Sequence, residues 1–133
     1  METKKMTRSQ KAQLLKEKRA LVETVERHLT NLKINAPACI HIETIQYECD
    51  SEHKSMGWLY YGDRKKEKLG LRYVAYRYSK GTKSIPLKKA PAEIIIQHAD
   101  KLKEIVSQIS QSFLWETKNK IEMLENKFVN VFK

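Results

Sequence analysis

The sequence predicts an α+β fold in which an N-terminal helix precedes a three-stranded antiparallel sheet and a long or broken C-terminal helix, in the order α-β-β-β-α. All four glycines and all three prolines fall between residues 37 and 91, so both flanks lack helix-breaking residues. Apolar residues recur every three or four positions in the flanks, whereas β-branched and aromatic residues concentrate in the middle. From the length of 133 residues we expect a single domain, 1–133, made of a basic N-terminal arm and helix (1–35), a sheet (38–79) and a C-terminal helical region (92–132).

The N-terminal helix is predicted to begin just after Thr7. Thr7 and Gln10 have the capping-box spacing, in which a hydroxyl and a side-chain amide satisfy free backbone N–H groups at a helix start. One apolar stripe follows and ends near Asn35, because the residues Leu14, Leu21, Val22, Val25, Leu29 and Leu32 recur at helical spacing.

Three segments in the middle of the chain have the composition of strands. They are the segment from Ile40 to Tyr47, the motif GWLYYG and the motif LGLRYVAYRY. Polar residues separate them, so we expect one hairpin turn within residues 50–54 and another within residues 62–68.

A helix is predicted to begin near Ala92 and to carry two apolar stripes that are rotated from each other. The first stripe is Ile95, Ala99, Leu102, Val106, Ile109 and Phe113, and the second is Leu114, Ile121, Leu124, Phe128 and Val131. The rotation indicates a bend between residues 110 and 117, although one long helix fits the composition as well. The second stripe has two interpretations: self-association as a homodimer through the C-terminal helix, or folding back on the chain's own core.

The net charge of +10 is distributed unevenly along the chain. It is +5 over residues 1–33, −4 over 34–63, +9 over 64–90 and zero over 91–133. An excess of this size is typical of a protein that binds a polyanion or an acidic surface.

Residues that could serve in catalysis or metal binding do not form a recognisable set. Cys39, His41, Cys49 and His53 have the side chains of a zinc site, but the two cysteines would lie roughly 33 Å apart along one strand. This distance also excludes a disulfide, so we expect two free cysteines. Clustered glycines and local nucleophile motifs are missing from the sequence, and we therefore expect no enzyme, no cofactor and no metal.

The strand from Leu69 to Tyr78 is predicted to have two different faces. Leu69, Leu71, Tyr73 and Ala75 alternate on a core face, and Arg72, Val74, Tyr76 and Tyr78 alternate on the other. The mixed aromatic and basic face could stack on bases and neutralise phosphates. Alternatively, its tyrosines pack across strands with arginines over their rings as cation–π partners.

The candidate binding surface is centred on the basic loops at the two ends of this strand, with Arg72 and Arg77 expected to bridge them. The acidic group Glu43, Glu48, Asp50 and Glu52 is interpreted as a solvated edge or as a counter-charge to the basic segment. The candidate nucleic-acid-binding residues are Arg64, Lys65, Lys66, Lys68, Arg72, Tyr76, Arg77, Tyr78, Lys80, Lys83, Lys88 and Lys89.

The central segment resembles a group of small uncharacterised proteins from bacteria and their mobile elements. The resemblance covers about residues 56–106, with a Trp-containing strand, a glycine in the next strand, a Pro-Leu connection and a helix with an early glutamate. The matching residues are Trp58, Gly70, Pro86, Leu87 and Glu93. The resemblance implies a bacterial, plasmid or phage accessory protein and brings no activity with it.

Two classes of function remain open at this point. The first is a small basic nucleic-acid-binding accessory protein, acting on DNA or RNA; the second is a non-enzymatic interaction module, an inhibitor or assembly factor that binds an acidic protein surface. The first residues lack the apolar stretch of a secretory signal, and no apolar run approaches the length of a membrane span, so a cytoplasmic location without membrane contact is expected.

Overall fold

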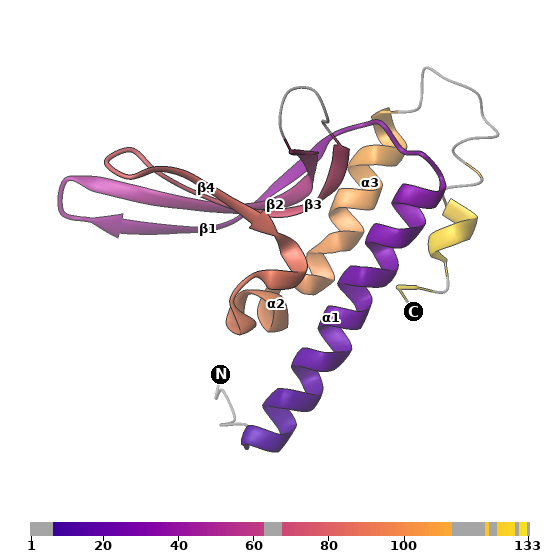
Figure 1. Ribbon diagram of the computed structural model, residues 1–133, viewed down its shortest axis with the longest axis horizontal. Coiled ribbons are helices and arrows are strands. Elements are labelled where there is room, and N and C mark those ends of the chain that lie inside the picture. Colours follow the sequence, from indigo (N-terminus) through magenta and orange to yellow (C-terminus); the bar gives the residue numbers. More distant parts are fainter. Residues whose placement is uncertain (1–6, 63–67, 113–121, 123–124, 130, 133) are drawn as a thin grey trace.

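The computed structural model describes residues 7–62, 68–112, 122, 125–129, 131 and 132. It is an α+β fold with an N-terminal helix, an antiparallel sheet and C-terminal helices, as the sequence predicted (Figure 1). In chain order its elements are α1 (Arg8–Asn31), β1 (Ala38–Tyr47), β2 (Asp50–Tyr61), β3 (Lys68–Arg77), β4 (Gly81–Pro86), the 3-10 turn η1 (Leu87–Lys89), α2 (Ala92–His98), the 3-10 turn η2 (Ala99–Lys101) and α3 (Leu102–Ser112).

The predicted capping box at the start of α1 is confirmed. The Gln10 backbone N–H donates to the Thr7 hydroxyl and the Thr7 N–H donates to the Gln10 side chain, both over 3.1 Å. The helix ends earlier than predicted, at Asn31, with backbone bonds from Lys33 to Thr30 and from Ile34 to Leu29. Lys33 then has a left-handed backbone with φ of 54°, so the chain turns back toward the sheet at that residue.

The sheet has four strands in the order β1-β2-β3-β4, and the prediction of three strands was wrong. The missed strand is β4, which pairs antiparallel with β3 from Arg72↔Pro86 to Arg77↔Gly81. Its sequence GTKSIP has no apolar alternation, since β4 is an edge strand with mostly exposed side chains. A strand of this composition cannot be distinguished from a connecting loop by its pattern alone.

The first hairpin turn lies at Glu48 and Cys49, and the prediction of a turn within residues 50–54 was wrong. Those residues instead form the start of β2, where Asp50 pairs with Tyr47 and His53 pairs with Thr44. Their polar side chains are compatible with a strand because this part of the hairpin extends past the hydrophobic core. The second predicted turn agrees with the structure, in which β2 ends at Tyr61 and β3 begins at Lys68.

The helices pack against one face of the sheet, here named the inner face. Its central residues Met56, Trp58 and Leu71 are at most 1% exposed and share one hydrophobic cluster with Val25 and Ile105 of α1 and α3. This confirms that the N-terminal helix and the C-terminal helical region cover the same sheet face. Among the described residues, no helix covers the opposite, outer face, where Gly57 and Arg72 are antiparallel partners (Figure 1).

The strands continue beyond this core as a projecting arm, which consists of residues 43–54 and 75–83. Figure 1 shows the β1–β2 and β3–β4 hairpins extending side by side away from the helices. No residue of the arm is fully buried. Its geometry therefore depends on strand pairing and on polar contacts between side chains rather than on a hydrophobic interior.

The helical region begins at Ala92 as predicted, and it contains a break at Ala99–Lys101 that was not predicted. The predicted break between residues 110 and 117 stays a prediction, because α3 ends at Ser112 and most of that range lies outside the described residues. The first apolar stripe is confirmed over the described residues, since Ile95, Ala99, Leu102, Val106 and Ile109 are buried. A short 3-10 turn keeps the apolar side chains facing the core while the helix axis changes direction, and apolar spacing alone does not reveal it. Phe113 and residues 113–117 lie outside the described residues.

Part of the second apolar stripe folds back on the chain's own core. Phe128 is 3% exposed, and its ring meets His28 of α1 edge-on with 5.7 Å between the ring centroids. Val131 also packs against the core, whereas Leu114, Ile121 and Leu124 lie outside the described residues. Homodimer formation stays a prediction. Within the described parts of the chain, no helix has the length and apolar character needed to cross a membrane.

Candidate polyanion-binding surface

The two arginines expected to bridge the basic loops lie on opposite faces of β3. Arg72 pairs with Gly57 and Pro86 on the outer face, and Arg77 pairs with Glu52 and Gly81 on the inner face of the arm. The arginines are five positions apart, and an odd spacing along a strand places side chains on opposite faces. They do not form the expected continuous bridge.

Arg72 is held flat against the outer face. Its Nε donates to the Ser84 hydroxyl over 3.0 Å, and one terminal nitrogen donates to the Ser84 carbonyl oxygen over 2.9 Å. The guanidinium carbon lies 5.3 Å from the centroid of the Tyr61 ring. Tyr76 lies on the same face and is 43% exposed. Among the described residues, Arg72 makes no ion pair with a carboxylate.

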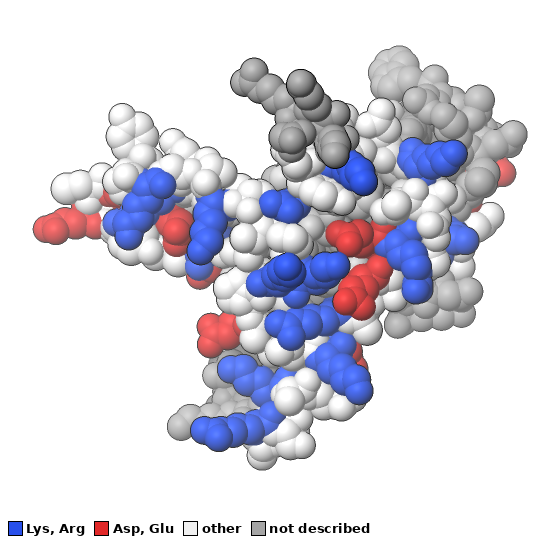
Figure 2. All heavy atoms as spheres, in the orientation of Figure 1, with Lys and Arg blue, Asp and Glu red and all other residues white. Residues whose placement is uncertain are grey.

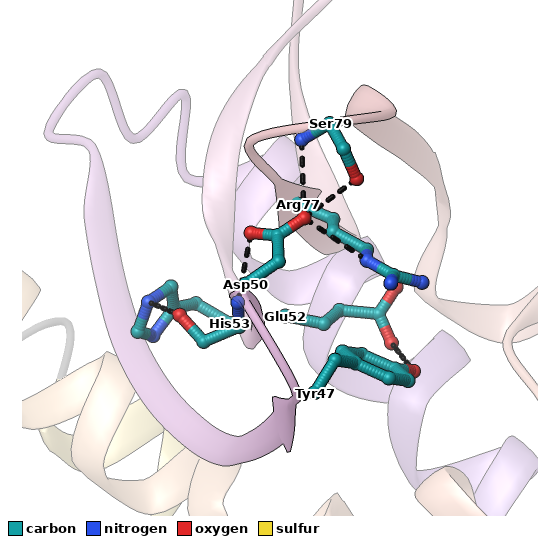
Figure 3. Close-up of polar contacts among 7 residues, drawn as sticks. Tyr47, Asp50, Glu52, His53, Arg77 and Ser79 are labelled. Atoms are coloured by element: carbon teal, nitrogen blue, oxygen red, sulfur yellow. Dashed lines mark hydrogen bonds and ion pairs between the residues drawn. The ribbon is translucent and has the colours of Figure 1, made fainter.

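Arg77 instead fastens the two hairpins of the arm together. Its guanidinium carbon lies 3.6 Å from the centroid of the Tyr47 ring, and its Nε lies 3.2 Å from Asp50 Oδ2. The same carboxylate oxygen accepts from the Ser79 hydroxyl over 2.6 Å and from the Ser79 N–H over 3.2 Å (Figure 3). We name the set Tyr47, Asp50, Arg77 and Ser79 the clasp. It confirms the counter-charge interpretation for Asp50 and the cation–π interpretation for Arg77.

The pKa of Asp50 reflects these contacts. The hydrogen bond from the Ser79 hydroxyl, with those from the Ser51 and Ser79 N–H groups and from Arg77, lowers the pKa of Asp50 to about 2 against the opposing effect of desolvation. At neutral pH Asp50 is therefore ionised and neutralises the charge of Arg77. Arg77 is not free to contact a ligand through that charge.

The remaining candidate residues are distributed over three other regions. Tyr78, which is 84% exposed, and Lys80 lie in the β3–β4 turn at the tip of the arm, and Lys83 pairs with Ala75 on its inner face. Lys68 is the first residue of β3, and Lys88 and Lys89 are exposed in η1. Arg64, Lys65 and Lys66 lie outside the described residues.

The structure brings the η1 lysines beside the basic N-terminal helix. η1 packs against α1 through Leu87, which is buried in the core cluster. On α1, Lys16, Arg19, Glu23 and Arg27 follow at spacings of three and four and are all exposed, so they form one stripe. We name Lys16, Arg19, Arg27, Lys88 and Lys89 the basic face. Figure 2 shows Lys and Arg side chains gathered along α1 and beside it, with acidic side chains between some of them.

The acidic residues near the core have other partners. Glu26 accepts a hydrogen bond from the Leu71 backbone N–H over 3.1 Å, at a point where β3 extends past the end of β4. Asp100 pairs with Lys18, and Glu43 pairs with Lys54. Within the described residues, no member of the basic face makes an ion pair within 4.0 Å. The five basic residues of this face outnumber Glu23, the one acidic residue of the stripe on α1, so the face keeps a positive charge among the described residues.

The basic face was only partly foreseen from sequence. Lys88 and Lys89 were among the candidates, but the three α1 residues were not, although the charge of +5 on residues 1–33 was evident. The spacing of Lys16, Arg19, Glu23 and Arg27 could have identified an exposed stripe. What no local pattern indicates is that η1, some sixty residues later in the chain, packs beside it.

The histidines of the rejected zinc set do come together. The ring centroids of His41 and His53 are 6.3 Å apart on the outer face, and the Thr44 hydroxyl lies 2.7 Å from His41 Nε2 and 3.2 Å from His53 Nδ1. Cys39 and Cys49 are free and exposed. Over the described residues, no group of three or more His, Cys, Asp or Glu side chains is placed to hold a metal ion.

Comparison of the chain with protein-family models, curated proteins and solved structures gives no match.

Proposed function

We propose that the protein is a small nucleic-acid-binding accessory protein that contacts the phosphate backbone through its basic face. The observation that carries this proposal is the packing of η1 against α1, which sets Lys88 and Lys89 beside an exposed stripe of three further basic residues. Five positive charges without ion-pair partners among the described residues favour a ligand with many negative charges.

The dimensions of the basic face suit a nucleic-acid backbone. From Lys16 to Arg27 the helix rises about 16 Å, at about 1.5 Å per residue. A DNA duplex carries about ten phosphate charges over that length, at about one per 1.7 Å of axis. Lys16 and Arg19 lie about one turn apart and Arg27 lies about two turns further along, so a rigid helix can contact several phosphates at once. This mode of binding requires no base contact and predicts weak dependence on sequence.

Binding to a short duplex tests the proposal. We expect the protein, after nuclease treatment and washing at high salt, to bind fluorescently labelled duplex DNA or RNA, with log affinity falling linearly against log salt. If all five residues contact phosphates, the slope on DNA should be about −4 to −5. A protein that binds neither duplex at low salt contradicts the proposal and leaves an acidic protein surface as its partner.

A further inference from the structure

A groove of about 490 Å³ lies where the end of α1 meets the ends of β2 and β3 nearest to it. Its apolar lining includes Trp58, which is 1% exposed, together with buried Ile34 and half-buried Leu69. Tyr60 and Tyr61 also line it and remain 50% and 38% exposed. The Tyr60 ring lies on the inner face with Trp58, whereas the Tyr61 ring lies on the outer face beside Gly70 and Arg72. The groove thus combines an apolar floor with one aromatic ring that the solvent reaches, that of Tyr60, which is the composition of a site for a flat ring.

The position of the two rings is set by the chain around them. Gly70 has no side chain, and a Cβ built there would collide with the Tyr61 ring, so the ring lies against the β3 backbone at this glycine. The Tyr60 hydroxyl donates to Asn35 Oδ1 over 3.0 Å. This bond also orients the Asn35 amide, because the oxygen faces Tyr60 and the two N–H donors remain for another acceptor. A nucleobase edge offers acceptors of that kind.

Two lysines contribute positive charge to the same groove. Lys33 and Lys68 both line it and are exposed, and the described lining residues include no carboxylate. Lys33 has a φ of 54°, at the helix-end position where glycine is strongly preferred. A lysine at this position costs stability that glycine would not, so its presence points to a use for the side chain.

The groove also continues the basic face. Arg27 precedes Thr30, a groove-lining residue, by three positions on α1, which is less than one helical turn. A strand whose phosphates follow the basic face would reach the groove at the end of the helix. We infer that the groove binds a nucleotide, with its base against the Tyr60 ring and its phosphate near the lysines, either free or as an unpaired residue of a nucleic-acid strand. The strand-bound form rests on the proposed function.

Two groove variants and one control test this inference. Lys33→Gly removes a charge and should raise the melting temperature, because glycine adopts the left-handed backbone conformation of this position without strain. Tyr60→Leu removes an aromatic ring. Tyr78→Leu, at the arm tip, removes a more exposed tyrosine outside the groove. Each is compared with the parent for binding a blunt nucleic-acid hairpin, the same hairpin with a single-stranded overhang, and adenosine or uridine monophosphate.

We expect the parent to bind the overhang hairpin about 5-fold or more tightly than the blunt one. Both groove variants should lose this advantage and keep the blunt-hairpin affinity to within a few fold, while Tyr78→Leu behaves as the parent. Mononucleotide binding that the groove variants lose, without hairpin binding, supports a free nucleotide as ligand and removes the proposed function. Equal affinity for both hairpins together with no mononucleotide binding overturns the inference, even where the blunt hairpin binds. Groove variants indistinguishable from the parent overturn it as well.

Discussion

Replacing Arg19, Lys88 and Lys89 together with glutamine is expected to weaken binding to duplex DNA by two to three orders of magnitude at about 0.1 M salt. Each phosphate contact contributes about 0.9 to the slope of log affinity against log salt, so losing three should make the slope shallower by about 2.7. All three residues are exposed, and none makes an ion pair among the described residues. The fold should therefore tolerate the changes, which circular dichroism can verify.

The matched control removes the same charge elsewhere. Lys80→Gln, Lys83→Gln and Lys103→Gln together neutralise three exposed lysines on the arm and on α3. We expect this variant to lose only a few fold, through the general reduction in positive potential. An equal or larger loss in the control would contradict the assignment of the ligand to the basic face.

Arg77→Gln is expected to weaken the side-chain contact between the arm's two hairpins, while the backbone pairing of β2 with β3 remains. The variant loses the guanidinium over the Tyr47 ring and the ion pair with Asp50, lowering the free energy of unfolding by about 1–2 kcal/mol. The Ser79 amide, which donates to Asp50, should exchange its hydrogen faster than in the parent. Arg72→Gln serves as the comparison, because it removes an arginine from the same strand on the opposite face and leaves the clasp intact.

The clasp should also respond to acid in a defined direction. The pKa of Asp50 is about 2 in the folded protein, below its usual value of 3.8. A carboxyl group with a lowered pKa stabilises the fold above its usual pKa, and this contribution is lost as the pH falls through the folded value. Protection of the Ser79 amide should thus be constant from neutral pH to about pH 4 and decline toward about pH 2. Protection that declines between pH 7 and pH 5 would contradict this account.

Most of the core could be predicted from the sequence, because buried apolar residues recur with the period of their helix or strand. Val22, Val25 and Leu29 recur at helical spacing, and Leu71 and Tyr73 lie on either side of Arg72 in an alternating pattern. The sequence of the arm has no such periodic pattern of apolar residues. β4 and the first residues of β2 pair through their backbones and are exposed on their side chains, so their composition is that of a loop.

The candidate surface was harder to predict than the fold, since it depends on the direction and partners of individual side chains. Arg72 and Arg77 lie an odd number of positions apart on the same strand. Arg72 therefore lies on the outer face, whereas Arg77 lies on the inner face and pairs with Asp50. Lys88 becomes part of a larger surface only because η1 packs against a helix at the other end of the chain. Charge counting identified the two basic segments, but their proximity required the tertiary structure.

The most direct test of the basic face is to map amide chemical shifts of the isotope-labelled protein as short duplex DNA or RNA is added at low salt. The largest changes are expected along residues 16–27 of α1 and at residues 87–89, with small changes along residues 70–76 of the sheet. Changes concentrated at Arg72 and Tyr76 with α1 unaffected, or no changes at all, would contradict the claim that α1 and η1 together bind nucleic acid.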